Sequence, residues 1–280
     1  MKKIFTFATS ITLGLSLIAQ TQTNKIMLDK NQQLKITSSI KGNITQEMMG
    51  QSMETVMDVN TDKNITVKEV ASKDYQLDGI TTHIKMNMSI MGQDMNFDSN
   101  NKEDMAGQMK EAGKDINVVK PLILTPEGKC RPVVKASPEK TEDAGMNDMM
   151  QQLMGGGAEE VVTESYFMLI PAGKKIGDSW TDSIINTASK TVWNYKWESV
   201  AENIAVIKAI AKSTISSTMN TQGMDMILNM VNDLDEVRKV NLNSGVVVNK
   251  SSTAKISGTI DVMGQSVPVN GNVTTIVNAQ

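Results

Sequence analysis

The sequence predicts an α+β fold dominated by β-structure: a large curved antiparallel sheet or open half-barrel built of hairpins, with a few covering helices. Over long stretches apolar and polar residues alternate, which is the period of strands that bury one face. The tripeptide Met-Gly-Gln occurs three times, at 49–51, 91–93 and 263–265, each time between alternating runs. Glycine readily adopts the positive φ that two-residue connections need, so each copy predicts a hairpin turn.

The second copy gives the clearest registration. With Gly92 and Gln93 at the centre of a type II′ turn, one face of the hairpin is apolar and the other polar. The apolar face contains Met86 and the facing pairs Ile90 with Met95 and Met88 with Phe97. The third copy alternates equally well over 255–274. The first is less regular, because Glu47 would face Glu54.

Residues 1–19 read as a secretory signal peptide. Lys2 and Lys3 precede a mostly apolar run without Asp or Glu, and the chain turns polar at Gln20. The run is short for a membrane span, so an uncleaved anchor is the minor alternative. No cysteine lies near the expected cleavage site, which argues against a lipoprotein. We expect a periplasmic or secreted protein without a stable membrane span after cleavage.

Charge and cysteine content exclude several classes of protein. The chain has 28 basic and 31 acidic residues, and without Lys2 and Lys3 the balance is 26 to 31, a net charge of −5. The basic residues are scattered among acids, so we expect no nucleic-acid partner. Cys130 is the only cysteine, which rules out an intramolecular disulfide. A chain of this length can bury about 70% of its unfolded surface, so no metal or cofactor is needed for stability.

The first half of the mature chain, about 20–135, should form strands and one short helix. Apolar parity changes between Leu77 and Ile84, and a β-bulge at Gly79 would reconcile the two sets. Residues 102–112 are polar and helix-compatible, with a stop at Gly113. The remaining expected elements are strands over 34–48 and 64–70 and a hairpin over 121–134 around the turn that contains Pro126.

A methionine-rich segment, 136–159, joins the two halves. Its apolar residues recur at helical spacing before three glycines at 155–157. They are Met146, Met149, Met150, Leu153 and Met154. We expect a helix that lies on the sheet or covers its mouth. With this segment as the join, residues 20–280 form a single β-rich domain of two similar halves.

The second half, about 160–280, repeats this plan. Trp193, Tyr195 and Trp197 alternate with polar residues, so their rings should share one face of a strand. Residues 204–217 fit a helix or a strand, and the Thr and Ser at their end favour a strand. Residues 224–234 have apolar side chains at helical spacing and predict a helix. The other expected elements are a strand over 164–170, a loop over 171–177, a strand opening near Trp180 and strands over 240–278.

Three groups of short motifs resemble an uncharacterised family of exported proteins, a domain of unknown function, from Gram-negative bacteria of the Bacteroidetes group. They are the second Met-Gly-Gln hairpin running into Phe97-Asp98-Ser99, the Ile170-Pro171 and Gly177-Asp178-Ser179-Trp180 pair, and the stretch 242–246. The resemblance covers nearly all of the mature chain and implies no catalytic residues. More loosely, the order of elements is similar to periplasmic lipoprotein-carrier folds, where an open half-barrel surrounds acyl chains. Such an analogy concerns fold and does not establish function.

No residue pattern predicts an enzyme. Gly177-Asp178-Ser179 is similar to the serine box of some hydrolases, but the single histidine, His83, lies far upstream on the expected solvent face. The motif is better explained as a turn before Trp180. One histidine and one cysteine cannot supply a usual zinc site, and Cys130 has no neighbouring base. We therefore expect a non-enzymatic protein without cofactor or metal.

Methionine, at 22 residues, is the remaining compositional signal. Methionine provides a pliable apolar surface, so a sheet face lined with it is suited to a lipid or another hydrophobic ligand. The candidate ligand-binding residues are Met86, Met88, Ile90, Met95, Phe97, Met149, Met150 and Leu153. A structural or protein-interaction role in the cell envelope is the alternative. A second alternative is periplasmic Cu(I) binding, because thioethers are soft ligands and several methionines are closely spaced.

Overall fold

The computed structural model describes residues 25–133 and 166–280, with a few gaps. The gaps are Met49, Ser72, Lys73, Met91, Gln108, Met263 and residues 186–187 and 222–223. The predicted signal peptide and the methionine-rich segment 136–159 lie outside the described residues.

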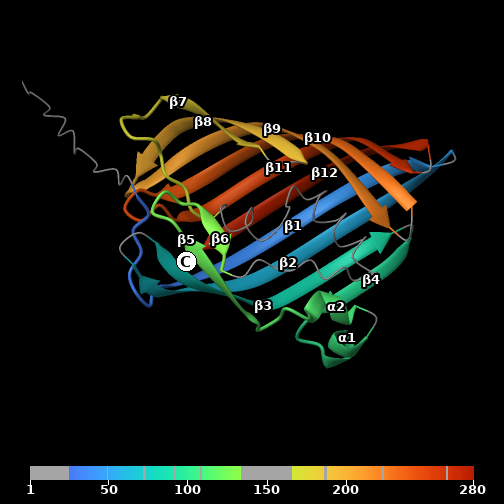
Figure 1. Cartoon of the computed structure of the whole chain (residues 1–280), viewed down its shortest axis with the longest axis horizontal. Coiled ribbons are helices and arrows are strands. Elements are labelled where there is room, and N and C mark those ends of the chain that lie inside the picture. The colour runs from blue at the N-terminus through green and yellow to red at the C-terminus, as the bar shows by residue number, and fades with distance from the viewer. Residues whose placement is uncertain are drawn as a thin grey trace, which may run out of the picture.

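The described chain forms one antiparallel sheet of 12 strands that curves into an open trough (Figure 1). The strands are β1 (Gln33–Met48), β2 (Gln51–Val70), β3 (Tyr75–Ile90), β4 (Gln93–Asp98), β5 (Val119–Leu124), β6 (Cys130–Pro132), β7 (Ser179–Ile185), β8 (Ser189–Ala201), β9 (Ile204–Thr221), β10 (Met224–Asn241), β11 (Val247–Val262) and β12 (Gln265–Ala279). Their order is β6-β5-β3-β2-β1-β12-β11-β10-β9-β8-β7, with β4 also pairing β3. The edge strands β6 and β7 do not pair with each other in this described sheet, which confirms the predicted open, β-dominated fold.

Strands from the beginning and the end of the chain meet at the middle of the sheet. Ile36 of β1 lies opposite Ala279 of β12, and the pairing continues as far as Gln46 opposite Val269. In Figure 1 the blue strand β1 accordingly runs beside the red strand β12. The sheet is therefore continuous between strands that precede and follow the segment 134–165.

All three Met-Gly-Gln copies form hairpin turns, but the predicted registration was wrong. The residues flanking each two-residue connection are Met48 and Gln51, Ile90 and Gln93, and Val262 and Gln265. Glycine therefore takes the second central position, with φ of 77° to 78°. The true pairing differs from the predicted one by two residues, which leaves every side chain on the same face. Alternation alone cannot distinguish these two registers.

A β-bulge occurs in β3, three residues after the predicted position. Asp62 of β2 lies opposite His83, and the next residue, Lys63, lies opposite Thr81, so Thr82 is the extra residue. The Thr82 hydroxyl donates to the Asp62 carbonyl oxygen at 3.2 Å. Gly79 remains in register and is buried. The bulge produces the parity change that the sequence shows between Leu77 and Ile84.

The helical predictions held only in part. Residues 102–112 form two short helices, α1 (Lys102–Ala106) and α2 (Lys110–Gly113), at the β4 side of the sheet. The Asn101 side chain caps α1 by accepting from the Glu103 amide at 3.0 Å. Neither of these described helices is long and apolar enough to cross a membrane. The helix predicted over 224–234 was wrong, because these residues belong to β10, whereas the strand favoured over 204–217 is confirmed as β9.

One face of the sheet, here called the inner face, carries the buried residues. In β12, Val267, Val269, Val273 and Val277 are buried while Asn270 is exposed. The same period of two places Tyr195 and Trp197 of β8 on the inner face, with Trp193 partly buried beside them. The predicted shared face of these three rings is confirmed.

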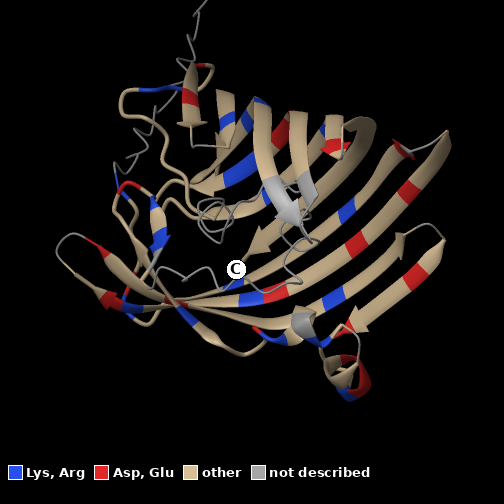
Figure 2. Ribbon diagram, turned by 45° about the vertical axis from the view of Figure 1, so that its right-hand side comes forward, with Lys and Arg blue, Asp and Glu red and all other residues tan. Residues whose placement is uncertain are grey.

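The opposite, outer face carries most of the exposed charged side chains, with exposed apolar residues such as Ile210, Ile227 and Ile276 among them. Basic and acidic residues are both scattered along the strands (Figure 2). His83 lies on this face, as predicted, with its Nε2 2.9 Å from Asp98 Oδ1 and its Nδ1 3.3 Å from Asp62 Oδ2. Hydrogen bonds from the Asn100 backbone and from His83 lower the pKa of Asp98 below its ordinary range. His83 therefore links three neighbouring strands on the solvent side.

Candidate functional site

The inner face is apolar at both ends of the trough. At one end, the beginning of the described chain and residues 166–170 pack over the strand termini: the Tyr75 hydroxyl donates to the Ile26 carbonyl at 2.6 Å, and Phe167 bridges to Val246. At the end that bears the Met-Gly-Gln turns lies a second group, here called the methionine cluster. Its buried members are Ile44, Met57, Met88, Ile215, Leu228, Met230, Ile256, Ile260, Val269 and Val273, with Ile40, Met86, Ile90, Met95, Met226, Ala254 and Val262 partly buried against them.

Four of the predicted ligand-binding residues belong to the methionine cluster. They are Met86, Met88, Ile90 and Met95. Phe97 pairs with Met86 across β3 and β4 but is fully buried at the border of the cluster, where Gly113 of α2 lies close to its ring. The other three candidates, Met149, Met150 and Leu153, lie outside the described residues.

The sequence analysis missed the cluster members that β9 and β10 contribute. Leu228 and Met230 of β10 are buried within it. Alternate residues of β10 point inward, but apolar Ile227 and Val231 on the outer face made a helical period fit equally well. Another missed feature is a row of methionines: Met57 lies opposite Met88, which lies opposite Met95.

Three charged side chains are buried on the inner face between the two apolar ends. Glu236 and Arg238 of β10 form an ion pair through Glu236 Oε1 and Arg238 Nε. The Lys250 Nζ of β11 lies 3.9 Å from the other carboxylate oxygen, Glu236 Oε2. The side chains of Glu236, Arg238 and Lys250 are 3%, 10% and 13% exposed, so this charged trio is shielded from water.

Aromatic rings cover the arginine. The Arg238 guanidinium lies 5.1 Å from the Trp193 ring centroid and 5.6 Å from that of Tyr195, within cation–π range. Tyr195 stacks on Trp180 and Trp193, with centroid separations of 5.3 and 5.8 Å. Burial raises the pKa of Tyr195 to about 12. The rings fix the arginine on the inner face and leave its charge in an environment of low dielectric.

Burial lowers the pKa of Lys250 below the ordinary lysine value of 10.5, although Glu236 opposes the shift. The unfolded chain therefore binds more protons than the folded chain between the folded pKa and 10.5. The free energy of unfolding should gain a positive slope with pH in that window, and Lys250→Met should remove this component. Urea denaturation between pH 7 and 9.5 measures it, with Lys208→Met on the outer face as the control. Parallel curves for wild type and Lys250→Met would contradict the prediction.

Asn232 is a buried polar residue inside the apolar surface. Its Oδ1 atom has no hydrogen-bond partner among the described residues. Since an unsatisfied buried acceptor costs free energy, Asn232→Leu should raise the free energy of unfolding by about 1 kcal/mol. Asn229→Leu, on the exposed outer face of the same strand, should gain nothing comparable. A loss of stability in Asn232→Leu would mean that this carbonyl oxygen has a partner, such as a bound water.

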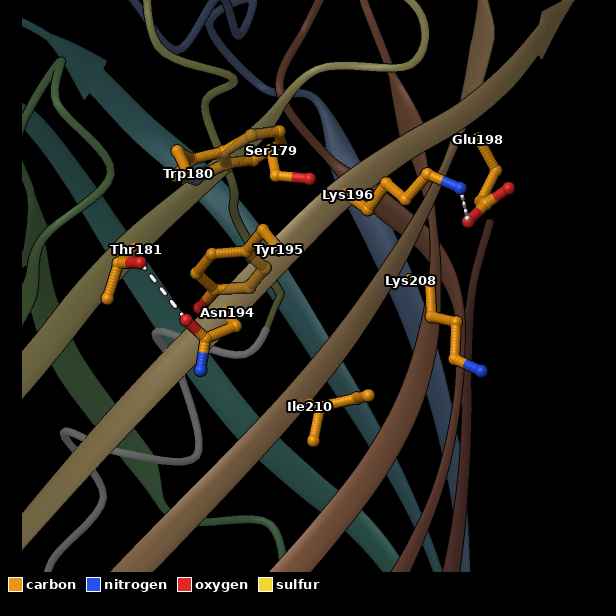
Figure 3. A pocket seen from close by; sticks show the side chains of 9 residues that line it. All are labelled: Ser179, Trp180, Thr181, Asn194, Tyr195, Lys196, Glu198, Lys208 and Ile210. Carbon is orange, nitrogen blue, oxygen red and sulfur yellow. Dashed lines mark hydrogen bonds and ion pairs between the residues drawn. The ribbon is translucent and has the colours of Figure 1, made fainter.

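A second feature is an open hollow of about 500 Å³ at the β7 edge of the sheet (Figure 3). Its polar rim includes a hydrogen bond between Thr181 and Asn194 and an ion pair between Lys196 and Glu198. Ser179 lies in this rim, and the preceding Asp178 carboxylate accepts from the Lys175 amide at 2.9 Å. The Gly-Asp-Ser motif is thus a turn, as predicted, and His83 lies several strands away on β3.

Comparison with known proteins adds a family match. Residues 130–247 match the model of a family of unknown function, DUF6263. The matched region is less than half of the chain and includes β7 to β10 with the Glu236 and Arg238 pair. No curated protein sequence matches the chain.

Solved structures are only distantly similar. A lipovitellin structure, described by its lipid–protein interactions, is 10% identical with a TM-score of 0.49, and the match covers 89% of this chain and 25% of that one. OmpF of Salmonella typhi in complex with daunomycin is 8% identical over 91% and 100% of the two chains, with a TM-score of 0.27. A domain assigned to outer-membrane lipoprotein sorting from Vibrio parahaemolyticus is 9% identical over 87% and 83%, with a TM-score of 0.15. The chain spans about a quarter of lipovitellin, and scores this low identify no shared function.

Proposed function

We propose that this is an exported, non-enzymatic protein of the bacterial cell envelope that binds a lipid or another hydrophobic ligand over the methionine cluster. One observation supports the proposal above others. Extensive contacts between described elements involve only neighbouring strands, α1 with α2, and α1 with β4. The methionine cluster is therefore an apolar face of a single-layered sheet, without a second layer among the described helices and strands.

The composition of the cluster supports a pliable binding surface. Met57, Met88 and Met230 are buried in it, and Met86 and Met95 are partly buried at its border. Methionine has an unbranched, flexible side chain and a polarisable sulfur, so it can adapt to apolar ligands of different shape. The partly buried methionines would supply the first contacts, and the buried ones the floor of the site.

The test is titration of the purified protein with a neutral hydrophobic fluorophore, N-phenyl-1-naphthylamine. Wild type should bind it saturably, and Met230→Asn should weaken binding by about tenfold, since it places a polar group in the apolar floor. Val56→Asn, on the exposed outer face of β2, is the matched control and should bind as wild type does. The proposal would be contradicted if Met230→Asn bound the fluorophore as tightly as wild type and Val56→Asn do. It would also be contradicted if wild type did not bind the fluorophore saturably.

Copper(I) binding is a second candidate, because Met57, Met88 and Met95 are successive neighbours across β2, β3 and β4. Such a row presents three thioethers side by side, and thioethers are ligands that select Cu(I). Metal analysis of protein isolated from its own cells tests this. About one copper ion per chain, lost in Met88→Leu, would favour copper over a hydrophobic ligand. Copper content at the level of an unrelated control protein would exclude it.

A further inference from the structure

The charged trio on the inner face does not balance. Glu236 supplies the one carboxylate of the trio, whereas Arg238 and Lys250 both carry a positive charge when protonated. Asp182 of β7 influences Tyr195 from the same side, but it is exposed to solvent and accepts from the Ser183 amide at 2.7 Å. When Lys250 is protonated, the trio therefore holds a net charge of one positive unit, shielded from water.

Unbalanced buried charge is costly to a folded protein. Two cations that share one carboxylate in a low-dielectric site repel each other, and well-packed apolar residues would generally be at least as stabilising. Desolvation is the largest cause of the lowered pKa of Lys250, and the neighbouring Arg238 charge lowers it further. A single negative charge from a ligand would neutralise the site and offset this cost.

The trio also lies where an amphiphile would place its head group. The β11 members of the methionine cluster nearest to it are Ala254 and Ile256, four and six residues from Lys250, or about 13 and 20 Å at the usual rise of a strand. On β10 the cluster begins at Met230, eight residues from Arg238. In the same cross-strand row as Arg238 and Lys250, the Ser38 and Thr61 hydroxyls lie 2.6 Å apart on the inner face. Buried Val277 lies between Lys250 and Ser38 in this row, so polar groups occupy the two ends of the row, between the methionine cluster and the apolar contacts at the other end of the trough.

We propose that Arg238 and Lys250 bind the carboxylate of a long-chain acid whose apolar chain lies over the methionine cluster. The inference rests on the proposed function and adds the chemical class of the ligand. One negative charge matches the net charge of the trio, whereas a phosphate monoester carries about 1.5 to 2 negative charges and would overcompensate it. Arginine and lysine donate charge-assisted hydrogen bonds to carboxylates, which are stronger than neutral ones.

The experiment measures displacement of the neutral fluorophore by dodecanoate, by dodecanol and by acetate at pH 7. We expect dodecanoate to bind about tenfold more tightly than dodecanol, because the charged head group adds a charge-assisted bond. Lys250→Met should remove this preference, so that dodecanoate and dodecanol bind with similar affinity. This variant retains the neutral Glu236 and Arg238 pair and is expected to fold. Lys208→Met, on the outer face of β9, should keep the preference.

The remaining outcomes separate this inference from the proposed function. Equal binding of dodecanoate and dodecanol would overturn the carboxylate site and leave a hydrophobic site in place. Absence of fluorophore binding would overturn both. A preference for dodecanoate that persists in Lys250→Met and Arg238→Gln would place the anion elsewhere, and displacement by acetate at similar concentration would indicate a site for free anions instead of an amphiphile. If Lys250→Met does not fold, the comparison of dodecanoate with dodecanol on wild type decides.

Discussion

Replacing Glu236 by glutamine should lower the free energy of unfolding by about 3 to 5 kcal/mol, because it leaves two buried cations without a carboxylate. Arg238 would lose its ion-pair partner and Lys250 the only carboxylate within 4 Å that the described residues offer it. Both side chains are almost fully shielded, so solvent cannot take over the role of Glu236. Urea denaturation at pH 7 of wild type and Glu236→Gln measures the effect.

The neighbouring residue on β10 provides the control. Asp235 pairs with Lys208 at 3.8 Å on the outer face, where the two side chains are 62% and 46% exposed. Asp235→Asn should change stability by no more than about 0.5 kcal/mol, as is usual for exposed ion pairs. Equal effects of the two substitutions would mean that Glu236 is not buried as described.

Gly258→Ala should destabilise the protein by about 3 kcal/mol, the upper range for an overpacked interior. A Cβ atom at this position of β11 would lie 2.1 Å from the Asn229 carbonyl oxygen and 2.8 Å from the Met230 Cα atom. These are backbone atoms of β10, so the clash can be relieved only by separating two strands of the curved sheet. The transition midpoint in urea should fall accordingly, with the slope unchanged.

Gly79→Ala is the matched control for this substitution. Gly79 is also buried in a strand, but its added Cβ would lie 3.4 Å from Leu122 Cδ1 and 3.6 Å from the Lys120 carbonyl oxygen, which are ordinary contacts. Its effect should stay within about 1 kcal/mol. A small effect at Gly258 as well would show that β10 and β11 are less closely apposed than the structure describes.

The sheet and its faces could be predicted from the sequence, because period-two alternation is a local property of each strand. It placed Met88 and Phe97 on the inner face, and it placed His83 on the outer one. The turn register could not be predicted, since a shift of two residues preserves every face. The change in apolar parity shows only that a bulge lies between Leu77 and Ile84, so the sequence did not determine which residue is the extra one. The extra residue is Thr82, and Gly79 was the wrong choice.

The charged trio could not be predicted from the sequence. In β10, Asn232 interrupts the apolar inner face within 224–234, where a helix was predicted, and Glu236 and Arg238 interrupt it further along the strand. Their burial depends on rings from β8 and on Lys250 from β11, which no local pattern connects. The β4 end of the methionine cluster was predicted from alternation, whereas its polar border emerged only from the pairing of distant strands.

Native mass spectrometry of the mature protein, purified gently from its own cell envelope, tests the central claim most directly. The protein should carry an additional mass that extracts into organic solvent as a long-chain compound, and a carboxylic acid among the extracted species would agree with the proposed role of Arg238 and Lys250. The same preparation of Met230→Asn should carry less of it. A ligand-free mass, together with no saturable binding of the neutral fluorophore, would contradict the claim that the inner face is a binding surface.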